Sequence, residues 1–245
     1  AFLFGVLISS VQILPAIEFI KLSAREVDQT YLPDRLDWFI PKQHLIQLVA
    51  PDFFGHPATY NYWGVFNYGE FVSFIGIIPL VFSLLALLLS KKITFFVSLA
   101  IFALIFGLEN PVSKIPYDLN LPLIAQAQPS RIIFLLDFAL VALAALGFDS
   151  FLKDKSKFKN FIPSLLISSL LLILLVTSFS STVFPQESTI NTQLVARRNL
   201  IVPLFTIFTL SIVFILKVFN VSGKIIIGLI FLITTLELFR FGSKF

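Results

Sequence analysis

The sequence has 245 residues, of which 57% are hydrophobic, 13% are charged and 30 are phenylalanine. Soluble domains carry about a quarter charged residues, because polar groups must cover their outer face. This composition therefore excludes an ordinary soluble domain and indicates a multi-pass integral membrane protein. The chain has no cysteine, which excludes disulfides and thiolate metal sites.

The two ends of the sequence suggest how it relates to a larger protein. It begins at Ala1 without an initiator methionine and stops at Phe245 directly after an apolar stretch, so we expect a fragment. The first 20 residues lack a basic n-region and a small-residue cleavage site, which argues against a signal peptide. We therefore treat residues 1–245 as one membrane domain.

Seven apolar stretches approach the length of about 20 residues that a helix needs to cross a bilayer. Backbone groups in lipid must bond to one another, and the stretches lack the alternation of barrel strands, so we predict helices. The predicted fold is an all-α membrane protein, a polytopic bundle of about seven transmembrane helices. The stretches occupy residues 1–20, 71–90, 93–108, 132–150, 160–179, 200–216 and 224–241.

Lysines indicate the orientation of these spans. They gather in every second connection: at Lys91 and Lys92, in the segment 153–159, and at Lys217 and Lys224. By the positive-inside rule these connections face the cytoplasm. The loops 21–70, 109–131 and 180–199 then face outward. We interpret the net charge of +4 as a topology signal and expect no nucleic-acid partner.

The loop 21–70 is far longer than the usual connection of about 4–6 residues, so we expect an ordered extracytoplasmic element with short helices. Its second half is aromatic, with Tyr60, Tyr62 and Trp63 close together. Two interpretations stay open. These rings belong either to an interfacial belt at the headgroups or to a surface that stacks on a sugar or lipid headgroup.

Asp52 and His56 lie in the same loop and raise the question of a metal site. Gly55 between them and Pro51 before them argue against a helix that presents both side chains. The sequence therefore predicts no metal ligands in this chain.

Arg131 stands at the outer end of the fourth predicted span, directly after Ser130, a plausible N-cap. The start of a helix attracts anions, and a guanidinium there adds a bidentate contact to phosphate. The alternative is that Arg131 extends to the phosphates of the surrounding lipid.

Charges inside the predicted spans differ in whether they have a local partner. Glu237 has Arg240 three residues further on, so we expect these two to pair on one helix face. Asp137 has no cation at helical spacing and lies about 9 Å inside its span. An isolated carboxylate in a membrane is a functional candidate, and the alternative is a protonated group bonded to a neighbouring helix.

These features, in this order along the chain, resemble the YfhO family of bacterial multi-pass membrane proteins. The resemblance runs from end to end, and its ordered spacing is more specific than any single motif. It rests on Val11–Pro15 with Glu18, Leu48–Gly55, Asn61–Gly64, Phe74–Leu80, Pro129–Arg131, Ala145–Asp149 and Glu237–Gly242.

The resemblance implies the GT-C class of glycosyltransferases, which move a sugar from a polyprenyl-phosphate carrier to an acceptor outside the membrane. It implies an inverting transfer, in which a carboxylate orients or deprotonates the acceptor hydroxyl and cations stabilise the phosphate leaving group. The key acidic residue of that class usually lies in the first outer loop of the full chain. We expect it upstream of this fragment, and a divalent metal in the full-length protein stays open.

The residues that the resemblance favours are binding residues. Arg131 would bind the phosphate, with Arg25 and Arg35 as weaker candidates, while the segment 60–63, which includes Tyr60, Tyr62 and Trp63, would bind the carrier or the acceptor. Asp137 would line the substrate groove. The expected partners are the bilayer of a bacterial plasma membrane, a polyprenyl-phosphate-sugar donor, and an envelope polymer or glycolipid as acceptor.

Two other functions compete with this interpretation. A transporter or flippase of lipid-linked saccharides would favour inverted repeats and charged or broken helices at mid-membrane, and the sequence has no evident repeat. A membrane scaffold without catalytic activity is the third hypothesis.

Overall fold

The computed structural model describes residues 2–23, 38–66, 68–91, 93–121, 124–125, 127–153, 159–180, 184 and 191–244. Every regular element in these residues is an α-helix or a 3-10 helix, which confirms the predicted all-α class. The one strand-like contact among them is a parallel bridge between Ile40 and Leu108.

Among the described residues, three helical segments are long and apolar enough to cross a membrane: Pro129–Lys153, Thr192–Val218 and Gly223–Gly242. The first joins the 3-10 turn η3 (Pro129–Ile132) to α7 (Ile133–Lys153), and the other two are α9 and α10. They indicate a membrane protein. Four other helices are also apolar: α1 (Phe2–Lys21), α4 (Ile77–Leu89), α5 (Thr94–Gly107) and α8 (Phe161–Thr177).

The second predicted span differs most from the structure. The stretch 71–90 is not one helix, because α3 (Tyr68–Phe71) ends at its first residue and α4 begins only at Ile77. Gly76 precedes α4 with a φ of 96°, a conformation that breaks a right-handed helix. The remaining 13 residues of α4 rise about 20 Å, less than the hydrocarbon thickness of about 30 Å.

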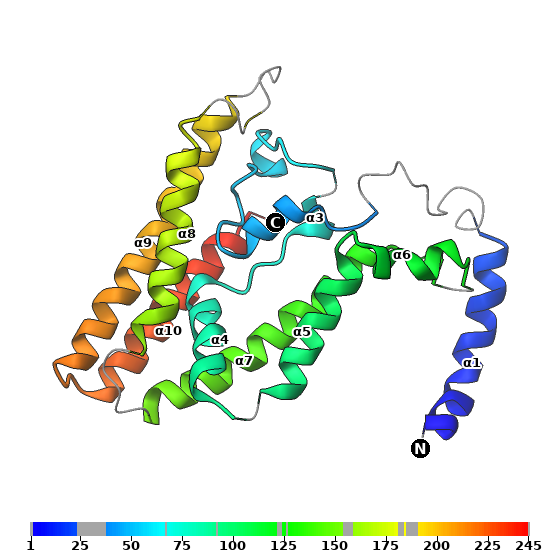
Figure 1. Ribbon diagram of the computed structural model, residues 1–245, viewed down its shortest axis with the longest axis horizontal. Coiled ribbons are helices and arrows are strands. Elements are labelled where there is room, and N and C mark those ends of the chain that lie inside the picture. The colour runs from blue at the N-terminus through cyan, green and yellow to red at the C-terminus, as the bar shows by residue number, and fades with distance from the viewer. Residues whose placement is uncertain are drawn as a thin grey trace.

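The helices run alternately up and down between two ends (Figure 1). α4, α7, α8, α9 and α10 enclose the hydrophobic core, α5 packs on α7, and α1 stands apart. α4, α7 and α9 all finish at one end, which we call the lysine end. The segment 38–66 lies at the opposite end, near the start of α9 and the end of α10, and we call this the loop end.

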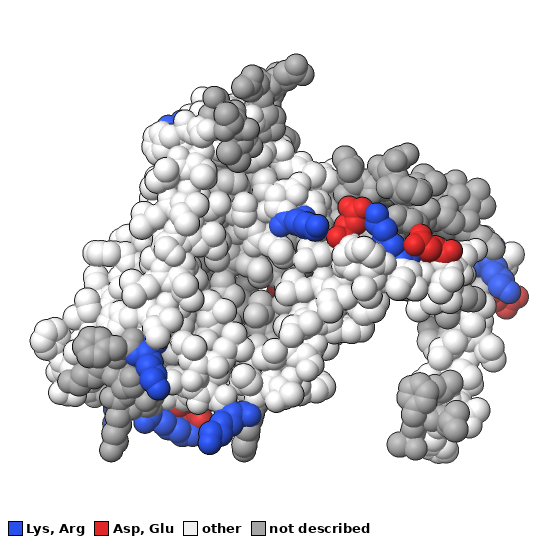
Figure 2. Space-filling view, in the orientation of Figure 1, with Lys and Arg blue, Asp and Glu red and all other residues white. Residues whose placement is uncertain are grey.

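Charged side chains occupy the two ends and leave an apolar surface between them. In Figure 2 blue side chains gather below the bundle, at the lysine end, and mixed charges lie near α6 (Pro111–Asp118). At the lysine end Lys217 donates to the backbone carbonyl of Phe151 and lies 3.6 Å from the centroid of its ring. A cation at the carbonyl end of α7 is favourable for the helix dipole and ties α9 to α7.

The contact between α4 and α7 depends on one glycine. A Cβ added to Gly147 would lie 1.8 Å from the carbonyl oxygen of Phe82, which is backbone and cannot rotate away. The absence of a side chain therefore lets the two helices approach backbone to backbone.

We expect Gly147→Ala to destabilise the protein by about 1–3 kcal/mol, because the helices must separate to admit the methyl group. Gly228→Ala is the matched control, since a Cβ at that helical glycine meets nothing within 4 Å. Thermal unfolding of the purified protein in detergent should show a lower Tm for the first variant only. Equal midpoints would contradict the close contact.

A second link joins α10 to the start of α4. The Glu237 side chain, 7% exposed, accepts a hydrogen bond of 3.1 Å from the backbone N–H of Ile77. A carboxylate suits the positive end of α4 and satisfies a donor that has no partner within the helix. The expected pairing of Glu237 with Arg240 is present only as an interaction of their charges, since the ion pair of Arg240 is with Asp52 at 3.8 Å.

We expect Glu237→Ala to cost about 1–3 kcal/mol, because the N–H of Ile77 would stay buried without an acceptor. Glu237→Gln keeps an acceptor oxygen and should lose clearly less. The measurement is again the Tm in detergent. If the alanine and glutamine variants unfold at the same temperature, the hydrogen bond to α4 is not what stabilises the contact.

Candidate functional site

The chain before Asp52 is fixed by a short network of buried side chains. His44 accepts a hydrogen bond from the N–H of Val65 at Nε2 and contacts the Oε1 of Gln47 at 2.8 Å through Nδ1. A neutral imidazole that accepts at Nε2 carries its proton on Nδ1, so His44 donates to Gln47. Gln47 in turn donates to the carbonyl of Pro51 at 3.1 Å.

The chain after Asp52 turns sharply around Gly55. This glycine has a φ of 81°, and a Cβ there would lie 2.1 Å from the backbone oxygen of Asn61. The Asn61 side chain accepts hydrogen bonds from the N–H of His56, at 2.9 Å, and from the hydroxyl of Thr59, at 2.7 Å. The turn therefore holds His56 and Asn61 beside Asp52.

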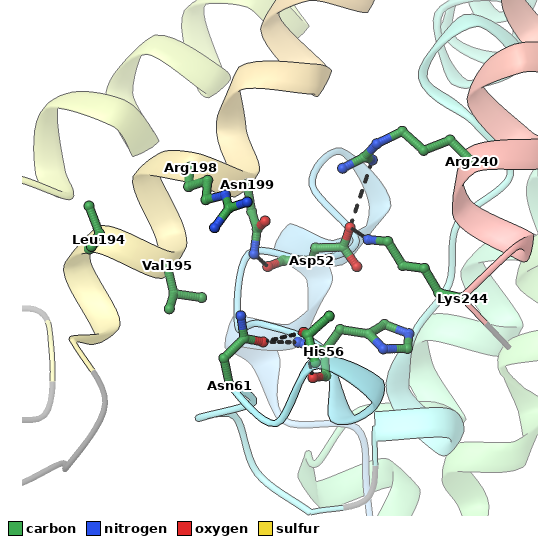
Figure 3. Close-up of a pocket in the computed structure, with 10 residues that line it drawn as sticks. Asp52, His56, Asn61, Leu194, Val195, Arg198, Asn199, Arg240 and Lys244 are labelled. Carbon is green, nitrogen blue, oxygen red and sulfur yellow. Dashed lines mark hydrogen bonds and ion pairs between the residues drawn. The ribbon is translucent and has the colours of Figure 1, made fainter.

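Asp52 joins three parts of the chain that are far apart in sequence. Its side chain is 3% exposed, and its Oδ2 accepts from Lys244 and lies 3.8 Å from the Nη1 of Arg240. Its backbone carbonyl accepts a hydrogen bond of 2.6 Å from the Asn199 side chain on α9. Figure 3 shows the carboxylate between the end of α10 and the start of α9.

A cavity of about 390 Å³ opens beside this carboxylate at the loop end. Three of its lining residues are cations, Arg198, Arg240 and Lys244, and one is an acid, Asp52. Arg198 is exposed and makes no ion pair with any residue that the structure describes. The cavity is therefore positively charged and suits an anion. The remaining lining residues are His56, Thr59, Asn61, Leu194, Val195 and Asn199.

The imidazole of His56 is a neutral group in this cavity. Burial lowers its pKa, and of the two nearby charges Asp52 opposes that shift and Lys244 adds to it. The N–H of Ala58 donates to Nδ1 at 3.1 Å, so the proton of the neutral ring is on Nε2. His56 thus offers a donor rather than a base.

The structure places Arg131 elsewhere, in an ion pair. Its Nε lies 3.1 and 3.2 Å from the two carboxylate oxygens of Glu70, and its Nη2 lies 3.1 Å from Oε1. Arg131 does not line the cavity. Its assignment to a phosphate stays a prediction, and a phosphate there would compete with Glu70.

The other predicted binding residues fall into three groups. Asp137 accepts a hydrogen bond from Ser73, a partner outside its own helix that the sequence did not identify. The segment 60–63 is only partly available, since Tyr60 is 92% exposed whereas Trp63 packs on aromatic rings of the loop. Arg25 and Arg35 lie outside the described residues.

Tyr62 is also occupied within the loop. Its hydroxyl donates to the carbonyl of Val65 at 2.5 Å, and its ring meets Tyr68 edge to face at 5.4 Å. Burial raises the pKa of the Tyr62 hydroxyl. Of the predicted aromatic surface, Tyr60 alone presents most of its ring to a ligand.

Sequence reasoning missed the residues that line the cavity. From the sequence, Asp52 is a candidate only for a metal site, and Arg240 only for a pair with Glu237. The sequence does show an acid in a loop and cations at the ends of two predicted spans. No local pattern indicates that these residues meet. The part of the chain that the structure describes holds no group of three or more His, Cys, Asp or Glu that could bind a metal.

No protein-family model matches the chain, and neither the curated proteins nor the solved structures contain a match.

Burial lowers the pKa of both histidines from 6.5, so the protein should lose stability in mild acid. Below that pH the unfolded chain binds protons that the folded chain does not yet accept, which favours unfolding. We expect the Tm in detergent to fall from about pH 7.5 to about pH 5.5. The fall should be smaller in His44→Gln, which removes one of the titrating groups. A Tm that is constant over this range would contradict the buried neutral state.

Proposed function

We propose that this chain is the membrane domain of a bacterial glycosyltransferase that takes a sugar from a polyprenyl-phosphate carrier. The acceptor is a polymer or glycolipid of the cell envelope. The observation that carries the proposal is the cavity at the loop end, which is lined by three cations, Arg198, Arg240 and Lys244, and by one carboxylate that pairs with the last two. The resemblance to the YfhO family supports the same reaction class.

The topology that we propose has about seven spans in the plasma membrane, with the lysine end in the cytoplasm. The cavity then opens on the outer face, where lipid-linked sugars are used. α4 and α5 are short for a span, and they would lie among other helices or in a thinned bilayer. The alternating direction of the helices supports this arrangement.

The cations match the chemistry of the leaving group. When the bond from the sugar to phosphate breaks, negative charge develops on the phosphate oxygen, and cations fixed in advance stabilise that charge. The guanidinium groups of Arg198 and Arg240 can each bind two phosphate oxygens. Leu194 and Val195, on the same wall as Arg198, provide apolar surface next to the phosphate for the first part of the prenyl chain.

The position of the phosphate is tested by comparing Arg198→Gln with Arg131→Gln in the full-length protein in vesicles. We expect Arg198→Gln to reduce consumption of polyprenyl-phosphate-sugar about 10²–10³-fold, because a cation at the developing charge is lost. Arg131→Gln should reduce it much less, since Arg131 already pairs with Glu70.

Expression and Tm of the two variants, measured beside the parent, control for folding. A larger loss in Arg131→Gln would move the phosphate to the start of α7. If the parent consumes no donor while labelled lipid-linked sugar crosses the bilayer, the protein is a flippase. If the parent does neither, the scaffold hypothesis remains.

A further inference from the structure

α6 turns away from the direction of the other helices. It follows the end of α5 and runs across the bundle (Figure 1). One side chain fixes this corner, because the amide of Asn110 donates to the carbonyls of Ile105, at 2.6 Å, and Leu108, at 2.8 Å. The same side chain accepts from the N–H groups of Val112 and Ser113 at the start of α6. A residue that caps both helix ends holds α6 crosswise to α5.

The inner side of α6 packs on the chain that leads to the cavity. Tyr117 meets the rings of Trp38 and Phe39 edge to face, with centroids 5.9 and 5.6 Å apart. Directly after these rings, the N–H of Ile40 donates to the carbonyl of Gly107 at 2.9 Å. α5, α6 and the start of the segment 38–66 are therefore joined to one another.

A second side of α6 is apolar and exposed. Val112, Ile115 and Leu119 are 49%, 49% and 65% exposed. Leu119 keeps the helical pattern, since its N–H donates to the carbonyl of Ile115 at 3.0 Å. Spacings of three and four residues place these three side chains on the same side of the helix. Large apolar groups at this exposure need a surface to cover them.

The charged side chains of α6 form a third side. Lys114 and Asp118 are four residues apart, and Lys114 pairs with Glu109 at 2.6 Å. In Figure 2 the charges near α6 lie on its upper side, and the surface below them is white. A helix with one apolar and one charged side, held across the direction of the spans, is typical of a membrane interface.

The level of α6 indicates which surface its apolar side meets. α5 ends beside the start of Pro129–Lys153, a segment that is long and apolar enough to cross a membrane. A Cβ on Gly107, the last residue of α5, would lie 3.1 Å from the side chain of Ile132. α6 therefore begins where a candidate span begins, which is the level of the lipid headgroups.

We propose that α6 is an interfacial helix that lies in the plane of the bilayer surface. Val112, Ile115 and Leu119 enter the boundary between headgroups and acyl chains, and Tyr117 holds the chain that leads to the cavity at the same level. The only cation of α6, Lys114, already pairs with Glu109, so the contact depends on apolar area and needs no anionic lipid. This position of α6 is the same whether or not the protein transfers sugar.

The sequence has no cysteine, so one introduced thiol can report on one position. Ile115→Cys and Leu119→Cys would carry a nitroxide spin label in the protein in phosphatidylcholine vesicles, and its collisions with oxygen and with a water-soluble nickel chelate would be measured. We expect frequent collisions with oxygen and rare ones with nickel, because oxygen concentrates in the lipid and the chelate stays in water.

Asp118→Cys is the matched control, one residue from Leu119 and also exposed. Its ratio of oxygen to nickel collisions should be several-fold lower than at Ile115 and Leu119. Phe205→Cys, in the middle of α9 and 64% exposed, gives the reference value for lipid. The Tm of each variant controls for folding, and Val112→Cys takes the place of a variant that unfolds.

Two results would overturn the proposal. Frequent nickel collisions at Ile115 and Leu119, as at Asp118, would show that this side of α6 lies in water. Rare collisions with both reagents would show that protein covers it, such as a second copy of the chain. The ratios should be the same in vesicles that contain phosphatidylglycerol. Contact with lipid only in those vesicles would contradict an apolar interaction.

Discussion

The pairing of the Asp52 carboxylate with the cations at the end of α10 is the constraint on which the loop end depends. A carboxylate that is 3% exposed would be costly without cations, so the fold must bring Lys244 and Arg240 to it. The same residue holds α9 through Asn199. The loop, α9 and α10 therefore cannot separate here without exposing or abandoning a buried charge.

α10 carries this constraint into the bundle. Glu237 and Arg240 are three residues apart on α10, so they lie on one face of the helix, and Lys244 follows just after the helix ends at Gly242. The first caps α4, and the other two meet Asp52. The orientation of α10 that lets Glu237 accept the hydrogen bond from Ile77 also directs Arg240 and the following Lys244 at the cavity.

The proposed reaction uses these structural charges in two ways. The cations keep the loop in place, and they also provide the charge that a lipid phosphate requires. Arg198, which makes no ion pair with a described residue, is the cation most available to a ligand. The same cations would hold the loop and bind the substrate, so the loop must be rigid. The hydrogen bonds that run from His44 through Gln47 to Pro51 provide this rigidity.

The sequence by itself determined the all-α class, the apolar character of the helices and the collection of lysines at alternate connections. These properties follow from residue type and local spacing, which set the free energy of transferring each segment into lipid. Only the tertiary structure decided which charges meet. It assigned Arg240 and Lys244 to Asp52, Arg131 to Glu70, and Glu237 to the start of α4. These partners lie 61 to 192 residues apart, and local periodicity carries no information about contacts over such separations.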